Sequence, residues 1–125
     1  MSLIGRLRRD RAGSLTVDFA MIIGPLLSLL LGTMEIGRLL WYQNALNYSV
    51  EEGARCATID ANNCGTTDQV KSYSAGKSGA GFAATVFSVS APACGNKVSA
   101  SYPMSLSIPF VSTSITLTAQ SCYPK

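Results

Sequence analysis

The four cysteines carry the most specific side-chain chemistry in the sequence. Cys56, Cys64, Cys94 and Cys122 are even in number, and no two of them have the C-x-x-C spacing of zinc ligands. All four follow a long apolar stretch near the N-terminus, and cysteines on the exported side of a membrane form disulfides. The sequence therefore predicts two disulfides. Three pairings are possible, and we favour Cys56–Cys64 with Cys94–Cys122 because nearest neighbours close local loops.

No residue pattern indicates catalysis. The chain has 125 residues and no histidine, which excludes a histidine-based triad, a histidine general base and a histidine metal ligand. Serine and threonine are abundant, but none of them is set apart by a neighbouring base and an orienting group. We therefore expect a protein that is not an enzyme and that has no cofactor and no metal.

The basic residues are concentrated at the N-terminus. Four of the ten Lys and Arg residues lie in the first eleven positions, opposed there by Asp10 alone. Residues 1–13 thus carry a charge of +3 (four minus one), and residues 14–125 carry zero (six minus six). A basic cluster directly before an apolar stretch, without interleaved aromatic residues, is better explained by membrane topology than by nucleic-acid binding. We expect no nucleic-acid partner.

The apolar stretch at residues 15–34 is long enough to span a membrane. Asp18 is its one charged residue. Twenty helical residues extend about 30 Å, which is the thickness of the hydrocarbon core, and a basic flank keeps its own side in the cytoplasm. A chain this small has too little structure to bury such a helix on all sides. We expect a cytoplasmic leader at 1–13, a transmembrane half-helix at 14–34 and an exported head at 35–125.

The periodicity of the apolar residues predicts an α+β fold. Three- and four-residue steps continue through residues 36–57, and no proline occurs between Pro25 and Pro92. One helix is therefore expected from about Ser14 to about Ile59, with Pro25 kinking it or locally opening its hydrogen bonds. We expect a loop at 60–67, a short helix at 68–75 and a flexible connection at 76–81.

From Thr85 onward apolar and polar residues alternate. This period of two predicts antiparallel strands near 87–90, 98–102, 104–108 and 115–119. Pro103 and Pro109 are expected at turns or edges between them. The small sheet should pack on the amphipathic second half of the long helix.

Charged and aromatic residues lie just beyond the apolar stretch. Glu35 and Arg38 have the spacing of an ordinary i,i+3 ion pair at a membrane boundary. Alternatively they contact a partner subunit, with Gly37 permitting close approach of a second helix. Trp41 and Tyr42 are either interfacial anchors or core residues packed against the sheet.

Asp18 is the most informative single residue. A carboxylate in an apolar span costs roughly 2.5–3.5 kcal/mol at mid-span, so it is either hydrated at the interface or has a partner. Gly13 lies five positions before Asp18, and Phe19 follows it. A basic leader ending in Gly, then an acidic residue, an aromatic residue and an apolar helix resembles a type IV pilin-like prepilin.

The longer run of motifs is similar to the TadE-like pseudopilins of the tight-adherence (Tad/Flp) pilus system. The matching features are Gly13, the VDFA run at 17–20, Pro25, the E-x-G-R run at 35–38 and the A-R-x-A run at 54–57. Two positions depart from the family pattern. The family usually has Glu where this chain has Asp18, and it tends to have Ala where this chain has Gly53.

The resemblance implies a structural role. Prepilin peptidase would cut after Gly13, and the new amine of Ser14 would pair with Asp18 of a neighbouring subunit, next to Phe19. The chain would be a minor pseudopilin that helps to initiate or assemble the pilus. Its expected partners are the peptidase, the major Flp pilin, another minor pseudopilin, inner-membrane platform proteins and a cytoplasmic assembly ATPase.

The expected location is the bacterial inner membrane with the head in the periplasm, and incorporation into a cell-surface pilus is a further expectation. Two alternatives stay open. The chain could be a small secreted, disulfide-bonded binding protein or enzyme with a conventional signal peptide cleaved near residue 33. It could also be a permanent bitopic membrane protein.

Overall fold

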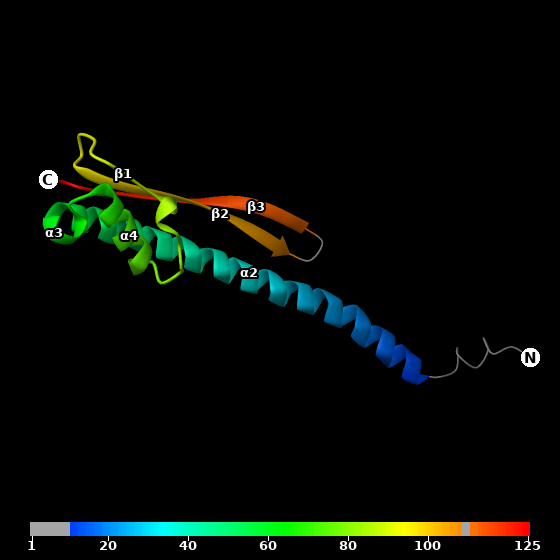
Figure 1. The fold of residues 1–125 in the computed structure, drawn as a ribbon. Helices are drawn as coiled ribbons and strands as arrows, with labels where there is room; N and C mark the ends of the chain where they lie inside the picture. Colours follow the sequence, from blue (N-terminus) through cyan, green and yellow to red (C-terminus); the bar gives the residue numbers. More distant parts are fainter. Residues whose placement is uncertain (1–10, 109–110) are drawn as a thin grey trace, which may run out of the picture.

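The computed structural model describes residues 11–108 and 111–125, so the first ten residues of the expected leader lie outside the described residues. The elements are α2 (Arg11–Ile59), α3 (Ala61–Cys64), α4 (Thr67–Lys77), the 3-10 turn η1 (Ala84–Val86), β1 (Phe87–Ser90), β2 (Asn96–Ile108) and β3 (Val111–Tyr123). The strands lie along the second half of α2, whose first half projects alone (Figure 1). The predicted α+β fold is confirmed.

α2 is a single helix of 49 residues with Pro25 inside it. Its end at Ile59 is the predicted one, and Figure 1 shows a gently curved rod without a break. Proline removes one backbone donor from the helix interior. Nearby, the hydroxyl of Ser28 donates a hydrogen bond of 3.0 Å to the carbonyl of Gly24.

The sheet is antiparallel with the order β1-β2-β3. β1 pairs with β2 from Phe87↔Ala100 to Ser90↔Lys97, and β2 pairs with β3 along its whole length. The alternation predicted from sequence is present on β2, where Val98, Ala100, Met104 and Leu106 are buried. The serines between them point away from α2.

Pro103 does not end a strand. The two strands predicted at 98–102 and 104–108 are one strand, β2, and Pro103 lies inside it opposite Thr116. β1 covers β2 only as far as Ala100, so beyond that residue β2 is an edge strand. An edge strand tolerates a proline whose missing N–H faces away from its neighbour.

The core of the head forms between α2 and the sheet. Leu46, Val50 and Ala54 lie four residues apart on one face of α2, and all three are fully buried. They belong to one cluster with buried residues of the strands: Phe87, Val98, Ala100, Met104, Leu117 and Ala119. This is the predicted packing of the amphipathic half-helix on the sheet.

The two disulfides have the favoured pairing. Cys56 is bonded to Cys64 and Cys94 to Cys122, so the far end of α2 is joined to α3 and the β1–β2 connection to the end of β3. Both bonds lie at the end of the head away from the N-terminal half of α2.

The segment predicted as a loop at 60–67 contains one helical turn, α3. Asp60 caps it, because its carboxylate accepts hydrogen bonds from the backbone N–H groups of Asn62 and Asn63 and from the Asn63 side chain. These bonds, with the Asn63 side chain first, lower the pKa of Asp60. The short helix predicted at 68–75 is present as α4, which begins one residue earlier and ends two residues later.

α4 crosses α2 at Gly53. Ser74 of α4 is fully buried, and a Cβ atom placed on Gly53 would overlap the Ser74 hydroxyl. Within the described part of the chain that hydroxyl has no hydrogen-bond partner. Where the family pattern has alanine, this chain has Gly53, and the Ser74 side chain occupies the space that the alanine methyl group would take.

Gly53→Ala should destabilise the head by roughly 1–3 kcal/mol, the usual cost of overpacking. Ser74→Ala removes the clashing hydroxyl, so Gly53→Ala should cost much less in that background. The matched control is Gly76→Ala in α4, where nothing lies within 4 Å. Urea unfolding of the natural chain, the two single variants, the double variant and the control, all in detergent, measures the coupling. Equal costs of Gly53→Ala in both backgrounds would contradict this packing.

Candidate membrane and assembly surface

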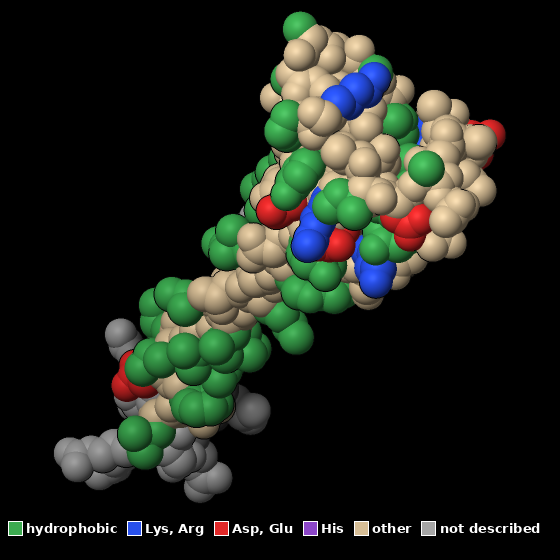
Figure 2. Space-filling model, turned by 90° about the vertical axis from the view of Figure 1, so that its left-hand side faces the viewer, with side chains coloured by type: hydrophobic (Ala, Val, Ile, Leu, Met, Phe, Trp, Pro, Cys, Tyr) green, Lys and Arg blue, Asp and Glu red, His purple; other side chains and the backbone are tan. Residues whose placement is uncertain are grey.

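The projecting first half of α2, residues 15–34, is here called the stalk. Apart from the partly buried Ile23, its large apolar side chains are about half exposed or more: Leu15, Val17, Phe19, Met21, Ile22, Leu26, Leu27, Leu29, Leu30, Leu31 and Met34. Figure 2 shows them covering the visible face of the stalk, while most charged side chains lie on the head. In the described residues α2 is long and apolar enough to cross a membrane, and its most apolar segment is unburied.

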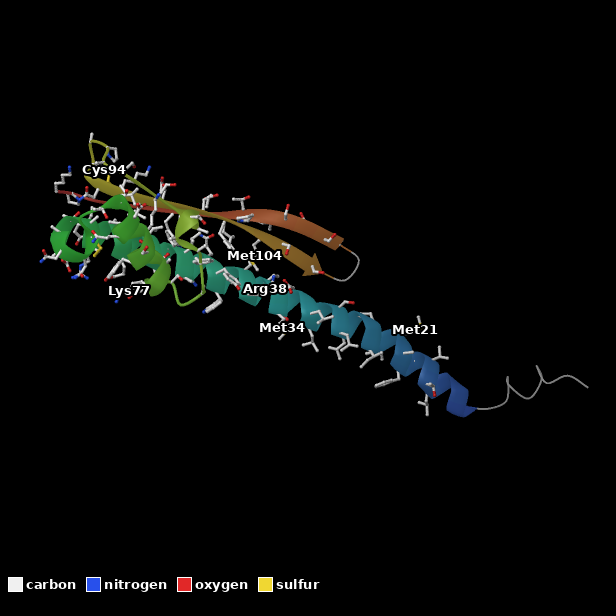
Figure 3. The ribbon with its side chains drawn as sticks, in the orientation of Figure 1. Met21, Met34, Arg38, Lys77, Cys94 and Met104 are labelled. Atoms are coloured by element: carbon white, nitrogen blue, oxygen red, sulfur yellow. A yellow bond between two sulfur atoms is a disulfide. The ribbon has the colours of Figure 1, made fainter. Side chains whose placement is uncertain are left out.

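Such a surface requires a non-aqueous environment. Monomeric soluble proteins rarely expose a contiguous apolar patch of more than a few hundred Å², and larger patches mark membrane or protein contacts. The stalk exposes apolar residues on every side of a helix, as a membrane-spanning helix does. Figure 3 shows Met21 and Met34 extending from the stalk with no other element beside them.

Asp18 lies on this stalk with Phe19, and both residues are exposed. Asp18 follows Ser14 by four residues, and both are inside α2, so their backbone positions are one turn apart on the same face. Gly13 lies in the first turn of the same helix. The three positions predicted for processing and pairing are therefore at one end of the stalk, away from the head.

A polar junction joins the stalk to the head. Arg38 Nη1 lies 3.7 Å from Glu35 Oε1, which is the predicted i,i+3 pair. Arg38 Nη2 also donates a hydrogen bond of 3.1 Å to the carbonyl oxygen of Ser105 on β2. Figure 3 shows Arg38 between α2 and the strands, near Met104. Glu35 Oε2 is buried without a hydrogen-bond partner among the described residues.

Gly37 has open space around it. No atom lies within 4 Å of the position that a Cβ would take there. Close approach by a helix of another subunit, which is the predicted role of Gly37, stays a prediction.

The sequence left open whether Trp41 and Tyr42 are interfacial anchors or pack against the sheet, and the structure places the two residues differently. Tyr42 packs in the head, with its ring 5.8 Å from those of Phe82 and Tyr102. Trp41 is 53% exposed and contacts the edge of Tyr42. Tyr42 is therefore partly buried and packs against the core, and Trp41 is the one of the two placed as an interfacial anchor would be.

Two further contacts of α2 with the sheet were not predicted. Gln43 Nε2 donates to the carbonyl oxygen of Thr118 at 3.0 Å, and the Asn96 side chain donates to the carbonyl oxygen of Ala57 at 2.9 Å. Both join α2 to residues more than 35 positions away, so no local spacing could have indicated them. The one indication in the sequence is that Gln43 and Asn96 are polar residues in segments that pack helix against sheet.

Within the described residues no group of three or more His, Cys, Asp or Glu side chains could hold a metal ion. A shallow hollow over the sheet is lined mainly by hydroxyl and amide side chains, including Ser88, Ser99 and Gln120. None of these lining side chains titrates near neutral pH. The surface with distinctive chemistry is the stalk and its junction with the head.

A comparison with protein families bears on this surface. A family model described as TadE-like protein matches residues 13–55, which confirms the resemblance predicted from the sequence. The matched segment begins at Gly13 and includes the stalk, the polar junction and most of the part of α2 that packs on the sheet. No curated protein and no solved structure matches the chain.

Arg38→Ala should loosen the β2–β3 ribbon where it meets the stalk. The variant loses one charge-assisted hydrogen bond and one ion pair, worth roughly 0.5–1.5 kcal/mol of local stability at this exposed site. Amide exchange at Met104 and Ile115 reports it. The control is Arg55→Ala, because Arg55 pairs with Glu52 at 4.0 Å on the same helix. Identical exchange in both variants would show that Arg38 does not hold the ribbon.

Proposed function

Because residues 13–55 carry the sequence pattern of the TadE-like family, whose members are pilus components, we propose that this chain is a minor pseudopilin of a Tad/Flp pilus. It is a structural protein and not an enzyme. The stalk anchors it in the bacterial inner membrane, and the head lies in the periplasm. From there the chain helps to initiate or assemble the pilus and can enter it.

The observation that carries the proposal is the start of the family match at Gly13. The residues before it are the basic leader, and the residues after it form an unbroken helix from the first turn of the stalk to the head. Cleavage after Gly13 removes the entire excess of positive charge and leaves a helix with the amine of Ser14 at its beginning. Prepilin peptidase is the proposed enzyme for this step.

A secreted protein with a conventional signal peptide fits the surface less well. Cleavage near residue 33 would divide α2 and leave a soluble head that exposes the apolar end of the helix. Met34 is 76% exposed, and Ile36, Leu40 and Trp41 are all more than half exposed. In the proposed pseudopilin these residues lie next to the membrane or to neighbouring subunits.

The proposed partners follow from the stalk. In the membrane it is surrounded by lipid, and in an assembly by the helices of the major Flp pilin and of another minor pseudopilin. Asp18 then leaves water for an apolar environment, where an unpaired carboxylate is costly and a positive amine lowers that cost. Platform proteins of the inner membrane and a cytoplasmic ATPase are the proposed assembly machinery.

The mature N-terminus tests the processing step. N-terminal sequencing and intact mass of the protein from its own cells should give a chain that begins at Ser14. Gly13→Val should leave the longer form, because the peptidase site is lost, while Gly24→Val in the stalk should still be processed. A mature chain that begins near residue 33 would contradict the proposal in favour of secretion.

Asp18 provides a separate test of assembly. Asp18→Asn removes the charge with almost no change in shape and should reduce recovery of the chain with the other pilus subunits at least tenfold, which corresponds to about 1.4 kcal/mol. Asp18→Glu keeps the charge and should behave nearly as the natural chain does. Unchanged recovery of Asp18→Asn, with normal processing, would rule out the pairing with Ser14.

A further inference from the structure

The outer edge of β3 has a defined pattern of backbone hydrogen-bonding groups. In an antiparallel pair, residues alternate between positions that exchange two backbone hydrogen bonds with the partner strand and positions that exchange none. Pro103 has no N–H and lies opposite Thr116, which makes this a non-bonded position. The backbone N–H and C=O of Thr116 therefore point away from β2. The same holds for Ser114 and Ser112, which lie two and four positions before it.

Two side chains of α2 support this assignment independently. Residues two apart on a strand point their backbone groups to the same side. Gln43 donates to the carbonyl oxygen of Thr118, which lies two residues after Thr116 and so faces the outer edge of β3. Arg38 donates to the carbonyl oxygen of Ser105, which shares the parity of Pro103 and faces the opposite edge, on β2. The helix thus contacts both free edges of the ribbon.

The two edges differ in their protection. The free edge of β2 contains Pro103 and the carbonyl bonded by Arg38, two devices that block strand pairing. On β3, Ser112, Ser114 and Thr116 are exposed, and the side-chain bonds from α2 to this ribbon in the described residues go to the carbonyl groups of Ser105 and Thr118 instead. Residues 98–124 contain no charged side chain, and residues 111–123 contain no proline. Natural edge strands normally carry such protection, so its absence here indicates use.

We propose that the outer edge of β3 at Ser112–Thr116 binds an extended segment of a different pilus subunit, which adds a fourth strand antiparallel to β3. This inference rests on the proposed function for the nature of the partner. Free N–H and C=O groups at strand spacing are satisfied by another extended backbone. The segment is uncharged where it faces this edge, since neither β3 nor residues 98–108 of β2 offer an opposite charge to a desolvated ion.

A second copy of this chain does not fit the same edge. β3 runs along α2 and away from the stalk, as Figure 1 shows. Antiparallel pairing of two β3 strands would therefore point their stalks in opposite directions, whereas both must enter one membrane. Parallel pairing about a two-fold axis places each residue beside itself. In a parallel pair, however, a residue whose N–H and C=O point toward the partner strand must lie beside a residue whose groups point away from it, so the two strands are offset by one residue.

Pairing of β3 with the free β2 edge of a neighbouring copy keeps the stalks parallel, but that edge is blocked by Pro103 and Arg38. The remaining edge, on β1, is four residues long and parallel to β3. The partner strand thus comes from another subunit and runs toward the membrane.

Amide hydrogen exchange tests the proposal on the full chain in membranes. Three preparations are compared: the purified protein in detergent, membranes from cells that make only this chain, and membranes from cells that make all pilus components. In the first two, the amides of Ser112, Ser114 and Thr116 should exchange fast while those of Thr113, Ile115 and Leu117, bonded to β2, exchange slowly. In the third, the first three amides should slow at least about tenfold.

Each other outcome overturns the proposal. Protection in cells that make only this chain would indicate a second copy, and fast exchange in all three preparations would show an unused edge. Thr116→Pro removes the outward N–H at a position that β2 does not use, so its unfolding midpoint should stay close to that of the natural chain. It should lose the protection of Ser112 and Ser114, while Thr116→Val keeps it. The mature N-terminus is determined in the same samples. A chain that begins at Ser14 but has an unprotected edge would overturn this inference alone, whereas a chain that does not begin at Ser14 would overturn the proposed function.

Discussion

The structure depends on one uninterrupted helix that must satisfy two different surroundings. Because all backbone hydrogen bonds of a helix are internal, α2 can pass from lipid to protein without leaving unpaired groups at the boundary. Its side chains divide accordingly. The stalk exposes apolar residues on every side, whereas beyond residue 38 one stripe is buried against the sheet and the exposed side carries polar residues such as Asn44, Asn47 and Glu51 among a few apolar ones. The continuity of the backbone transmits the position of the anchor to the head.

The head is built onto this helix by contacts of different kinds. Buried aliphatic residues of α2 and the strands provide most of the stabilisation, as hydrophobic burial generally does. Direction and spacing come from polar contacts, in which Arg38 and Gln43 bond to carbonyl groups on opposite edges of the β2–β3 ribbon. At the far end, the side chain of Asn96 on β2 bonds to α2, one disulfide joins α2 to α3, and the other joins the β1–β2 connection to β3. The β2–β3 ribbon is therefore held to α2 at both ends, while among the described residues no side chain bonds to the outer edge of β3 at residues 112–116.

The sequence predicted the elements that rest on periodicity. The extent of α2, the alternation on the strands and the disulfide pairing all follow from local spacing, and all are present in the structure. Errors occurred where a local rule met a tertiary context. Pro103 was expected at a turn or an edge between two strands; it does lie on an edge, but inside one continuous strand, because its missing N–H costs nothing where β2 has no neighbour. The turn α3 was expected as a loop, although Asp60 and the nearby disulfide stabilise it.

Other parts of the surface could not be predicted from one sequence. Gly53 was noticed only as a departure from a family pattern, and its reason is a serine on another helix, 21 positions away. The parity of the β3 edge depends on which residue lies opposite Pro103, and register is a property of the folded sheet. The positions around Gly13 and Asp18 were found from the sequence. Their backbone lies at one end of the stalk, but their roles depend on other molecules.

The central claim is that α2 lies in the membrane along the stalk and enters the head without interruption. All four native cysteines are paired in disulfides, so a single introduced cysteine accepts a nitroxide label. Collision rates with oxygen and with a water-soluble nickel complex, measured for the protein in bilayers, test the claim directly. Labels at Ile22 and Leu29 should collide with oxygen and be shielded from nickel, and a label at the exposed Asn44 should show the reverse. Nickel access at Ile22 equal to that at Asn44 would contradict the account.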